Sequence, residues 1–475
     1  MQEAGRAVAR AVLRDFEEIG GFSSKGRVLV LAGKGHNAGD AFLAAAAIVA
    51  AFPAASVDVL FAFGERVLRP LATRAYRDLA QAAGKRLAVL SPAGLTGSYD
   101  LCLDGLFGFQ FHPPASREIA ALIEAVNVLP IRLRAAVDLP SAGLFRADFS
   151  YATGSVKDPL LLDECAGRIR YLDLGFFRGT ERGRDRVLIS EILAPLAALR
   201  SPRADKRSQG HLLVLGGSRS YPGAILMTVL AALRSGAGLV TAFVPRSLAP
   251  AFAARAPEAM WVGWPETPDG GLALEGMPLL RERLPRATAI AIGPGLGREP
   301  ETLALVTGIV KTARLPVLLD ADALQPEIIG AAKTPLVLTP HAGEFARIAG
   351  ASSKKKAGEG LQEQLRAFVR KTRATVVLKG PITRVTNGAE IYHSFFGGPV
   401  LARGGSGDLL AGLVGGLLAQ TPKDPLLAAC RGTVWHGAAA DLLARKFGHS
   451  AVQTTQLLDF LSAALRESPD EQRVD

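Results

Sequence analysis

A glycine-rich turn near the carboxyl terminus holds residues suited to phosphate chemistry. It reads Gly404, Gly405, Ser406, Gly407 and Asp408, and it leads directly into an apolar helical stretch. Glycines let the backbone approach a phosphate closely, and the free N–H groups of a helix start attract anions. A carboxylate beside the phosphate can accept a proton from an attacking hydroxyl group. Taken alone, the turn is equally compatible with an ordinary glycine-rich helix start, because short glycine motifs recur by chance.

The same half of the chain has polar or flexible residues after several expected strands. Residues 216–224 and 291–297 are glycine-rich segments between a strand and a helix. Parallel strands present their carboxyl ends at one edge of a sheet, so we expect these segments to share a site. Further groups expected at this edge are Asp320, Asp322, His341, Glu344, Lys379 and Thr383.

Some of these residues have structural alternatives. Asp320 and Asp322 can cap the following helix through their side-chain oxygens, so we treat them as secondary site candidates. His341 can be a packed histidine that caps a strand end. His436 is expected to pack on its own helix rather than to contact a ligand.

The first half of the chain has a comparable turn at residues 33–41, between an expected strand and an alanine-rich helix. Asn37 offers a carbonyl and an amide group to a cation or ligand, and Asp40 can cap the next helix. Asp104 and Asp138 lie at the ends of neighbouring expected strands and supply carboxylates at the same edge. The pattern indicates a second ligand site.

Short β-rich runs alternate with helical stretches throughout, which predicts an α/β protein with parallel, doubly wound sheets. A segment rich in arginine and proline near Pro202 separates two such series, so we expect domains at about residues 1–190 and 200–470. The first series opens with a helix over residues 3–19. The expected strands are 27–32, 57–61, 101–104 and 134–138, then 212–216, 239–243, 289–293, 316–320, 336–339 and 375–379.

Composition narrows the class of protein. No apolar run approaches the roughly 18 residues of a membrane span, and the N-terminus lacks a secretory signal pattern. The three cysteines, Cys102, Cys165 and Cys430, form no disulfide or metal pattern, so we expect a reducing cytoplasm. The net charge of +11 lies largely in residues 200–207 and 354–356. We interpret these as a solvated linker and loop, and expect neither a nucleic-acid nor a membrane partner.

The carboxyl-terminal motifs, in this order, resemble the ADP/ATP-dependent NAD(P)H-hydrate dehydratase family of the ribokinase-like superfamily, over about residues 206–465. The run from Pro257 to Met260 is also typical of this family. The resemblance implies a ribokinase-like α/β/α domain. It implies nucleotide contacts at Lys379, Gly380, Pro381, Ile382, Thr383, Gly404, Gly405, Ser406 and Gly407, and hydrate contacts at Ala224, Gly297, His341 and Asp408.

The implied reaction starts with phosphoryl transfer from ADP or ATP, with Mg²⁺, to the C6 hydroxyl group of hydrated NADH or NADPH (NADHX, NADPHX). Asp408 takes the hydroxyl proton, and elimination of phosphate then restores the cofactor. The sequence departs from the family pattern at Arg403, residues 205–207 and residues 394–399, and these differences can alter nucleotide preference. A vitamin or sugar kinase and a nucleotide-binding regulatory protein remain alternatives, because the same turn serves several functions.

The amino-terminal half resembles the NAD(P)H-hydrate epimerase family, with a Rossmann-like doubly wound sheet, commonly fused ahead of the dehydratase. The resemblance implies a K⁺ site at Asn37, Asp104 and Ser141 and a catalytic role for Asp138. It implies hydrate contacts at His36, Asn37, Ala38, Gly39, Asp40, Gly108, Phe109, Gln110, Phe111, His112, Pro113, Pro114 and Asp138. It also implies a homo-oligomer, a tetramer or an octamer.

This half departs further from its family. Ala38 replaces a glycine and adds a Cβ where we expect the backbone to approach phosphate. Ala142 looks like an inserted residue, and residues 146–157 look shortened by a strand. Residues 1–5 match a family helix that normally follows a further segment, so either the start lies upstream or that segment has been lost. The sequence is compatible with an active epimerase domain and with a structural or regulatory relic. It chooses neither between ADP and ATP as the nucleotide nor between NADHX and NADPHX as the substrate.

Overall fold

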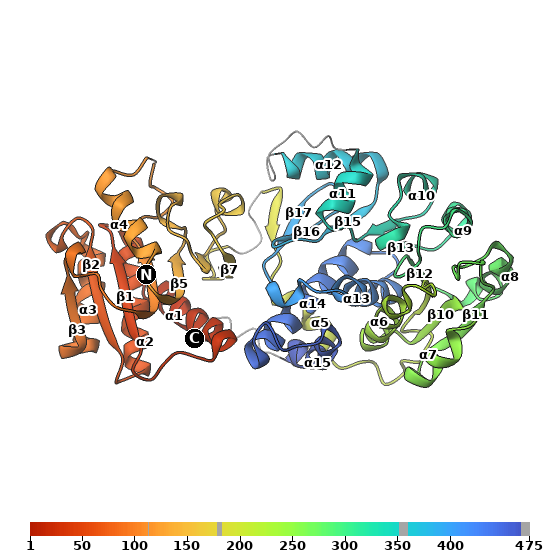
Figure 1. Ribbon diagram of the computed structural model, residues 1–475, viewed down its shortest axis with the longest axis horizontal. Helices are drawn as coiled ribbons and strands as arrows, with labels where there is room; N and C mark the ends of the chain where they lie inside the picture. Colours follow the sequence, from red (N-terminus) through yellow and green to blue (C-terminus); the bar gives the residue numbers. More distant parts are fainter. Residues whose placement is uncertain (113, 178–182, 351–359, 467–475) are drawn as a thin grey trace. The chain divides into compact units, whose positions relative to one another are not determined.

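The computed structural model describes residues 1–112, 114–177, 183–350 and 360–466, which form two compact units (Figure 1). The amino-terminal unit comprises Met1–Arg182 with Ala444–Ala451. The carboxyl-terminal unit comprises Gly183–Leu443 with Val452–Arg466. Both units are α/β, as the alternation of strands and helices predicts.

A seven-stranded parallel sheet, in the order β3-β2-β1-β4-β5-β6-β7, forms the centre of the amino-terminal unit. The strand order reverses between β1 and β4, and the loops that follow strands at such a reversal are where doubly wound sheets bind ligands. The strands are β1 (Arg27–Ala32), β2 (Ser56–Phe61), β3 (Leu87–Leu90), β4 (Tyr99–Gly105), β5 (Ile131–Val137), β6 (Phe149–Thr153) and β7 (Arg168–Leu172). The helices are α1 (Gln2–Phe16), α2 (His36–Ala51), α3 (Pro70–Ala83) and α4 (Arg117–Asn127).

Helices cover both faces of this sheet. Val28 and Val30 of β1 pack in one apolar cluster with α1, α2 and α3, whereas Leu29 and Leu31 pack in a second cluster with α4. Because both faces are buried, β1 reads as a continuous apolar run. The alanine-rich stretch over residues 41–52 forms a buried helix in the first cluster, as the sequence predicts.

The carboxyl-terminal unit is built on a ten-stranded sheet in the order β11-β10-β9-β12-β13-β14-β15-β16-β17-β8. The pairs from β11 to β15 are parallel, and β15, β16 and β17 form an antiparallel meander. The order reverses between β9 and β12. The strands are β8 (Asp185–Val187), β9 (His211–Leu215), β10 (Leu239–Pro245), β11 (Met260–Trp264), β12 (Ala289–Ile292), β13 (Val317–Leu319), β14 (Leu336–Leu338), β15 (Thr375–Leu378), β16 (Thr383–Thr386) and β17 (Ile391–Ser394).

Two helical layers enclose this sheet in an α/β/α arrangement (Figure 1). One layer contains α9, α10, α11 and α12, whose apolar residues share a cluster with Leu213 and Leu215 of β9. The other contains α6 and α13, which pack closely together against β9 and β12. The helices are α5 (Ala194–Ala197), α6 (Pro222–Arg234), α7 (Ala249–Arg255), α8 (Met277–Arg281), α9 (Pro300–Thr312), α10 (Pro326–Ala331), α11 (Ala342–Ala349), α12 (Leu361–Thr372), α13 (Ser406–Gln420), α14 (Pro425–Phe447) and α15 (Leu457–Arg466).

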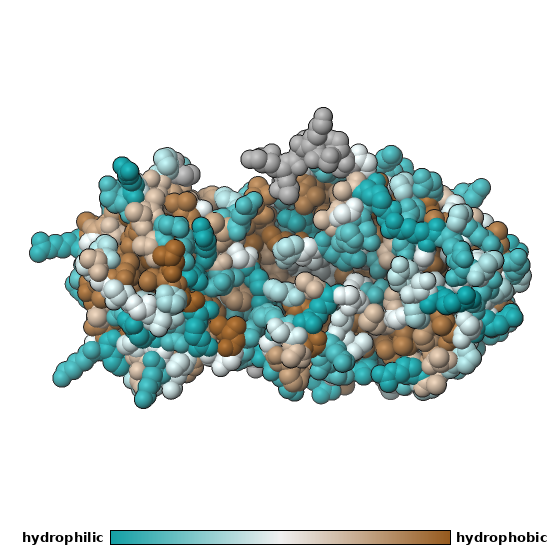
Figure 2. All heavy atoms as spheres, in the orientation of Figure 1, coloured by the Kyte–Doolittle hydropathy of each residue, from teal (hydrophilic) through white to brown (hydrophobic). Residues whose placement is uncertain are grey.

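Every strand expected from the sequence is present, and β3, β6, β7, β8, β11, β16 and β17 are additional. The segment over residues 146–157, which looked shortened by a strand, contains β6, paired between β5 and β7. Among the described residues no helix is both long and apolar enough to cross a membrane. On the face shown in Figure 2, hydrophilic and apolar side chains are interspersed over both units.

Candidate functional site

The first turn of α13 presents Asp408 at the carboxyl edge of the larger sheet. Gly405 precedes the helix with φ +89°, a left-handed conformation that glycine adopts without strain. Thr228 of α6 donates to the backbone oxygen of Asp408 at 3.1 Å, which fixes the turn against α6. Burial and the charge of Asp320 together raise the pKa of Asp408 to about 6, against the opposing charge of Lys379. Asp408 is thus a weakly acidic carboxyl group beside a helix start.

Lys379 connects this turn to two carboxylates. Its Nζ lies 3.2 Å from Oδ1 of the buried Asp320 and 3.9 Å from Oε2 of Glu344. A Cβ built on Gly407 would lie 3.2 Å from the same Nζ, so the ammonium group is directly beside the glycine turn. Burial lowers the pKa of Lys379, but Asp320 and Glu344 outweigh it and raise that pKa above its usual value. Lys379 therefore carries a fixed positive charge where a phosphate can bind.

Asp320 and Asp322 hold neighbouring loops and do not cap the following helical turn. Asp320 also accepts a hydrogen bond from the Thr339 hydroxyl group at 2.7 Å. Asp322 accepts from the backbone N–H of Gly297 at 3.2 Å and from Arg298 Nε at 2.8 Å. The capping alternative for these two residues is wrong, because their side chains bond across the site instead.

The loops after β9 and β12 are packed against each other. The Gly217 N–H donates to the Pro294 oxygen at 2.8 Å. A Cβ on Gly295 would lie 2.3 Å from the Tyr221 oxygen and 3.1 Å from the Ala224 methyl group, so only glycine fits there. Ala224 and Gly297 are therefore at neighbouring positions of one edge, as the sequence predicts.

His341 caps α11 rather than a strand end. Its Nδ1 accepts from the backbone N–H groups of Gly343 at 3.1 Å and Glu344 at 3.3 Å, and the Glu344 carboxylate accepts from the His341 backbone N–H at 2.8 Å. With Nδ1 as acceptor, Nε2 carries the proton. The side chain is 61% exposed, so the packed alternative is wrong, and its Nε2 lies 3.6 Å from Glu344 Oε1. A backbone bridge joins His341 to Lys379.

The other predicted site residues of this unit differ in how far they are exposed to solvent. Gly380, Pro381 and Gly404 are exposed, and Ile382 and Thr383 are partly exposed on the turn from β15 to β16. Ser406 is buried. His436 of α14 is buried as well, and burial lowers its pKa to about 4, so it packs inside the unit as expected.

In the amino-terminal unit, Asp104, near the end of β4, and Ser141, after β5, form a buried pair. Asp104 accepts from the Ser141 hydroxyl group at 2.6 Å and from its N–H at 2.8 Å. Burial raises the pKa of Asp104 to about 6, although these bonds oppose the shift. Asn37 lies next to this pair, where its amide nitrogen donates to the carbonyl oxygens of Phe107 at 2.6 Å and Val137 at 2.7 Å. The structure therefore brings the three predicted K⁺ ligands to one edge.

Asp138 is held by groups that the sequence did not single out. It has φ +71°, an uncommon conformation for a residue other than glycine. Lys157 donates to its Oδ1, and the Thr153 hydroxyl group donates to the same oxygen at 3.2 Å. Lys157 escaped prediction because it follows β6, a strand that the sequence reading did not include. The signal in the sequence was the charged side chain of Lys157 soon after β6, but it could be used only if that strand had been predicted.

Two expectations about the turn over residues 33–41 are wrong. Asp40 does not cap a helix, because α2 begins at His36 and Asp40 lies inside it. The Ala38 side chain is fully buried in the apolar core, so its Cβ does not face the loop surface. Gly39 is buried as well, whereas His36 is exposed.

The loop after β4 presents aromatic and polar side chains at the same edge. The Phe107 and Phe111 rings stack with centroids 4.0 Å apart. Gly108 faces the Asn37 amide group, since a Cβ there would lie 3.0 Å from Asn37 Oδ1. The exposed predicted residues of this loop are Phe109, Gln110, His112 and Pro114, and Pro113 lies outside the described residues.

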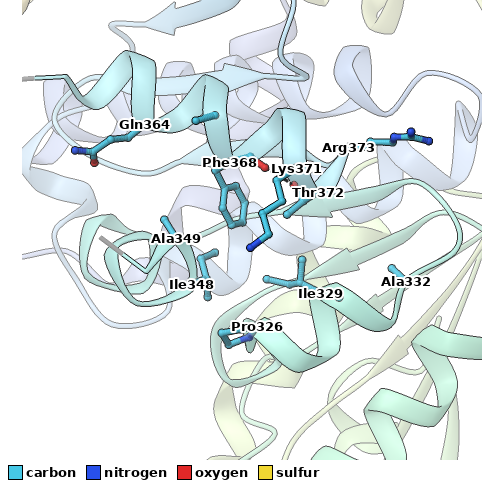
Figure 3. A pocket seen from close by; sticks show the side chains of 12 residues that line it. Pro326, Ile329, Ala332, Ile348, Ala349, Gln364, Phe368, Lys371, Thr372 and Arg373 are labelled. Carbon is cyan, nitrogen blue, oxygen red and sulfur yellow. Dashed lines mark hydrogen bonds between the residues drawn. The ribbon is translucent and has the colours of Figure 1, made fainter. Parts of the chain in front are cut away.

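A separate hollow of about 650 Å³ opens between α10, α11 and α12 (Figure 3). Ile329, Ile348 and Phe368 line it, and the Lys371 side chain extends between them. None of the predicted site residues lines this hollow, so we keep it apart from the candidate site.

Family models match both units. The model for "NAD(P)H-hydrate dehydratase" matches residues 212–463, and the model for "YjeF-related protein N-terminus" matches residues 1–157. A crystal structure of a ribokinase-like superfamily protein from Enterococcus faecalis V583 has a TM-score of 0.53 and 27% identity, covering 61% of this chain and 99% of its own.

Curated relatives extend over the whole chain. A protein from Moorella thermoacetica, "Bifunctional NAD(P)H-hydrate repair enzyme", is 33% identical and covers 99% of this chain and 93% of its own length. A protein of the same description from Gloeobacter violaceus is 36% identical over 98% of this chain and 93% of its own. An "ADP-dependent (S)-NAD(P)H-hydrate dehydratase" from Xanthomonas campestris is 37% identical over 53% of this chain and 86% of its own.

Proposed function

The chain belongs to the family of bifunctional NAD(P)H-hydrate repair enzymes, and on this premise we propose how its two units divide the work. The carboxyl-terminal unit dehydrates (S)-NADHX or (S)-NADPHX with ADP or ATP as phosphoryl donor. The amino-terminal unit converts the R epimer into the S epimer. We propose domains at residues 1–190 and 200–470, and the family-model matches at 1–157 and 212–463 support two domains. In the structure the carboxyl-terminal unit begins earlier, at Gly183, because β8 pairs with β17 of the larger sheet.

The convergence of Asp408, Lys379 and Gly407 carries the dehydratase assignment. Asp408 accepts the proton of the C6 hydroxyl group as that oxygen attacks the terminal phosphoryl group. The backbone N–H groups of residues 404–407 and the Lys379 ammonium stabilise the charge on the transferring phosphoryl group. Loss of phosphate then regenerates the dihydronicotinamide ring. Ala224, Gly297 and His341 bind the hydrate, and Lys379–Thr383 with the glycine turn bind the nucleotide.

Mg²⁺ fits this arrangement as a companion of the nucleotide. Burial and the Asp320 charge raise the pKa of Asp408, so this part of the site gains from an added positive charge. We place the ion on the nucleotide phosphates and water, with Asp408 and Asp320 beside it. When bound, it neutralises charge on the phosphates.

The test of the dehydratase assignment is recovery of the near-ultraviolet absorbance of the dihydronicotinamide. Purified protein is given (S)-NADHX or (S)-NADPHX with Mg²⁺ and either ADP or ATP. We expect absorbance to return only with nucleotide, and the four combinations establish both preferences. A stable phosphorylated product without recovered absorbance would point to a small-molecule kinase instead.

We propose that Asp104, Ser141 and Asn37 hold K⁺, with help from the Phe107 and Val137 carbonyl groups. The oxygens of the buried Asp104–Ser141 pair suit a hard cation. Asp104 ionises in the folded unit only above its pKa of about 6, whereas its ordinary value is 3.8. Its negative charge therefore destabilises the unit as pH rises through this window, and K⁺ should offset that cost only above about pH 6.

The K⁺ assignment is tested by thermal unfolding. Potassium chloride should raise the unfolding midpoint of the amino-terminal unit above the value in choline chloride at equal ionic strength, and more so above pH 6 than below it. Asp104→Asn should abolish the difference. An equal effect of both salts at every pH would contradict the site.

Epimerase activity itself is measured from (R)-NADHX, with ADP, Mg²⁺ and an excess of a separate dehydratase. Cofactor recovery faster than spontaneous epimerisation, and dependent on K⁺, supports an active amino-terminal unit. No acceleration would identify it as a structural or regulatory relic.

By family resemblance we also propose a homo-oligomer, a tetramer or an octamer, which light scattering distinguishes. We propose a cytoplasmic location as well, which the three free cysteines support.

A further inference from the structure

Arg298 lies at the carboxyl edge of the larger sheet, directly after the proposed hydrate contact Gly297. Its Nε donates to Oδ1 of Asp322 at 2.8 Å, and the other oxygen of Asp322 accepts from the Gly297 N–H at 3.2 Å. One carboxylate thus binds both the arginine side chain and the backbone of the loop that carries it. The guanidinium group is therefore held beside Gly297.

The guanidinium group of Arg298 has more donors than Asp322 uses. Arginine carries five N–H bonds in a planar fork, and Asp322 accepts the one on Nε. In the described part of the chain, Asp322 is the only side chain that forms a hydrogen bond or an ion pair with Arg298. The Arg298 side chain is 64% exposed, so the four N–H bonds on its two terminal nitrogens can meet a ligand. Such a fork matches the oxygens of a phosphate group.

Arg298 and Lys379 place two positive charges at different points of the same edge. The hydrogen bond and the charge of Asp322 raise the pKa of Arg298, and the charge of Glu344 adds to this effect. Glu344 also lies 3.9 Å from Lys379 Nζ. The strands β13 and β14 lie between β12, which precedes Arg298, and β15, which precedes Lys379. Three strand spacings put the two backbones roughly 14 Å apart, so each cation can serve a different ligand.

The hydrate has anionic groups away from its reacting ring. NADHX keeps the pyrophosphate of NADH, and NADPHX has a 2′-phosphate in addition. The residues proposed to bind the hydrate do not match these charges: Ala224 and Gly297 are uncharged, and His341 uses its Nδ1 as an acceptor, which keeps the ring neutral. Since the nucleotide phosphates are assigned to the Lys379 end of the edge, Arg298 supplies the cation that the hydrate end otherwise lacks.

We propose that Arg298 binds a phosphate group of the hydrate through its two terminal nitrogens, and that Asp322 is a positioning residue that orients the guanidinium group. This inference rests on the proposed dehydratase function and deepens it, because it assigns the residue that recognises the phosphate part of the substrate. A contact remote from the reacting ring stabilises the bound substrate and the transition state equally. It should therefore act on KM and leave kcat nearly unchanged.

Steady-state dehydration by the full-length protein tests the proposal with Arg298→Ala and, as a matched control, Arg370→Ala. Arg370 is 59% exposed and bonds to Glu363 at 2.7 Å, but it lies near the end of α12, before the amino end of β15. In Arg298→Ala, KM for (S)-NADHX should rise by about 10-fold, the low end for a hydrogen bond to a charged group because Arg298 is exposed. Arg370→Ala should leave KM and kcat unchanged.

Shortened substrates identify the phosphate group. The hydrate of reduced nicotinamide mononucleotide has one phosphate, and the hydrate of reduced nicotinamide riboside has none. A loss of kcat/KM in Arg298→Ala that includes the mononucleotide hydrate assigns the contact to the phosphate next to the nicotinamide riboside. A loss with NADHX but not with the mononucleotide hydrate assigns it to the second phosphate, and a loss with NADPHX alone to the 2′-phosphate. An equal loss with the riboside hydrate, or no loss with any substrate, would overturn the proposal.

Two further measurements separate the contact from other roles of Arg298. Arg298→Lys keeps the charge but lacks the planar fork, so it should restore only part of the affinity. Complete recovery would mean that charge alone suffices, and the positioning role of Asp322 would then be wrong. Calorimetric affinity for ADP should be the same in Arg298→Ala as in the wild-type protein. A loss of ADP affinity would place Arg298 at the nucleotide and overturn the contact with the hydrate.

Failure of this inference can be told apart from failure of the dehydratase function. If the wild-type protein regenerates the dihydronicotinamide and Arg298→Ala keeps the wild-type KM, only the role of Arg298 is wrong. If the wild-type protein regenerates nothing from (S)-NADHX or (S)-NADPHX with either nucleotide, the dehydratase function is wrong and the phosphate contact fails with it.

Discussion

Asp408 is the residue on which the dehydratase assignment can be tested most directly. Asp408→Asn keeps the size of the side chain and the Thr228 bond to the backbone, but it removes the proton acceptor. We expect the rate of (S)-NADHX dehydration to fall by about 10²- to 10⁴-fold or more, as for loss of a positioned base. Nucleotide affinity, measured by calorimetry, should stay nearly unchanged. An unaltered turnover rate would show that another group is the base.

The surroundings of Asp408 predict opposite pH shifts for two neighbouring substitutions. A base works ionised, so kcat/KM for the hydrate should rise with pH through the Asp408 pKa of about 6 and level off above it. Lys379 lowers this pKa and Asp320 raises it. The acid limb should therefore move to higher pH in Lys379→Met and to lower pH in Asp320→Asn. Shifts in the same direction would contradict the assignment.

At the scale of elements, the contact between α6 and α13 sets the distance between Ala224 and Asp408. A Cβ on Gly412 would lie 2.1 Å from the backbone oxygen of Thr228, and backbone cannot yield as a side chain can. We expect Gly412→Ala to separate the two helices and to cost about 1–3 kcal/mol by overpacking. Calorimetric unfolding and dehydratase activity should both decline.

Gly308 of α9 provides the matched control for this substitution. A Cβ at Gly308 meets no atom within 4 Å. Alanine has a higher helix propensity than glycine, so Gly308→Ala should stabilise the carboxyl-terminal unit by about 0.5–1 kcal/mol. A loss of stability in both variants would mean that helix packing is not the cause.

The elements also show how far the sequence determines the site. The strands β1, β9 and β12 were predictable because each is an apolar run that ends in a glycine turn, and adjacent parallel strands place their loops at one edge. The His341 cap and the hydrogen bonds of Asp322 could not be predicted from the sequence. A polar residue after a strand can turn toward either its own helix or a neighbouring loop. The contact of Lys157 with Asp138 depends on β6 pairing with β5, a property of topology.

At the scale of the whole molecule, two sites in one chain can act independently or in sequence. Each unit has its own sheet, apolar core and ligand edge. Independent sites would exchange the S epimer through solution. The two variants should then behave differently. Asp138→Asn should repair (S)-NADHX normally and (R)-NADHX only at the rate of spontaneous epimerisation. Asp408→Asn should repair neither epimer.

Mixing the two variants tests that independence. Because each protein retains the site that the other lacks, an equimolar mixture with ADP, Mg²⁺ and K⁺ should repair (R)-NADHX faster than either alone, with a rate that follows the concentration of both. The measurement is absorbance recovery from the pure R epimer, and a mixture of wild-type protein with inactive Asp138→Asn/Asp408→Asn protein is the control for dilution. Failure of the mixture, with wild-type protein active, would require transfer of the S epimer within one molecule. Since a freely diffusing product needs no contact between the units, we expect complementation.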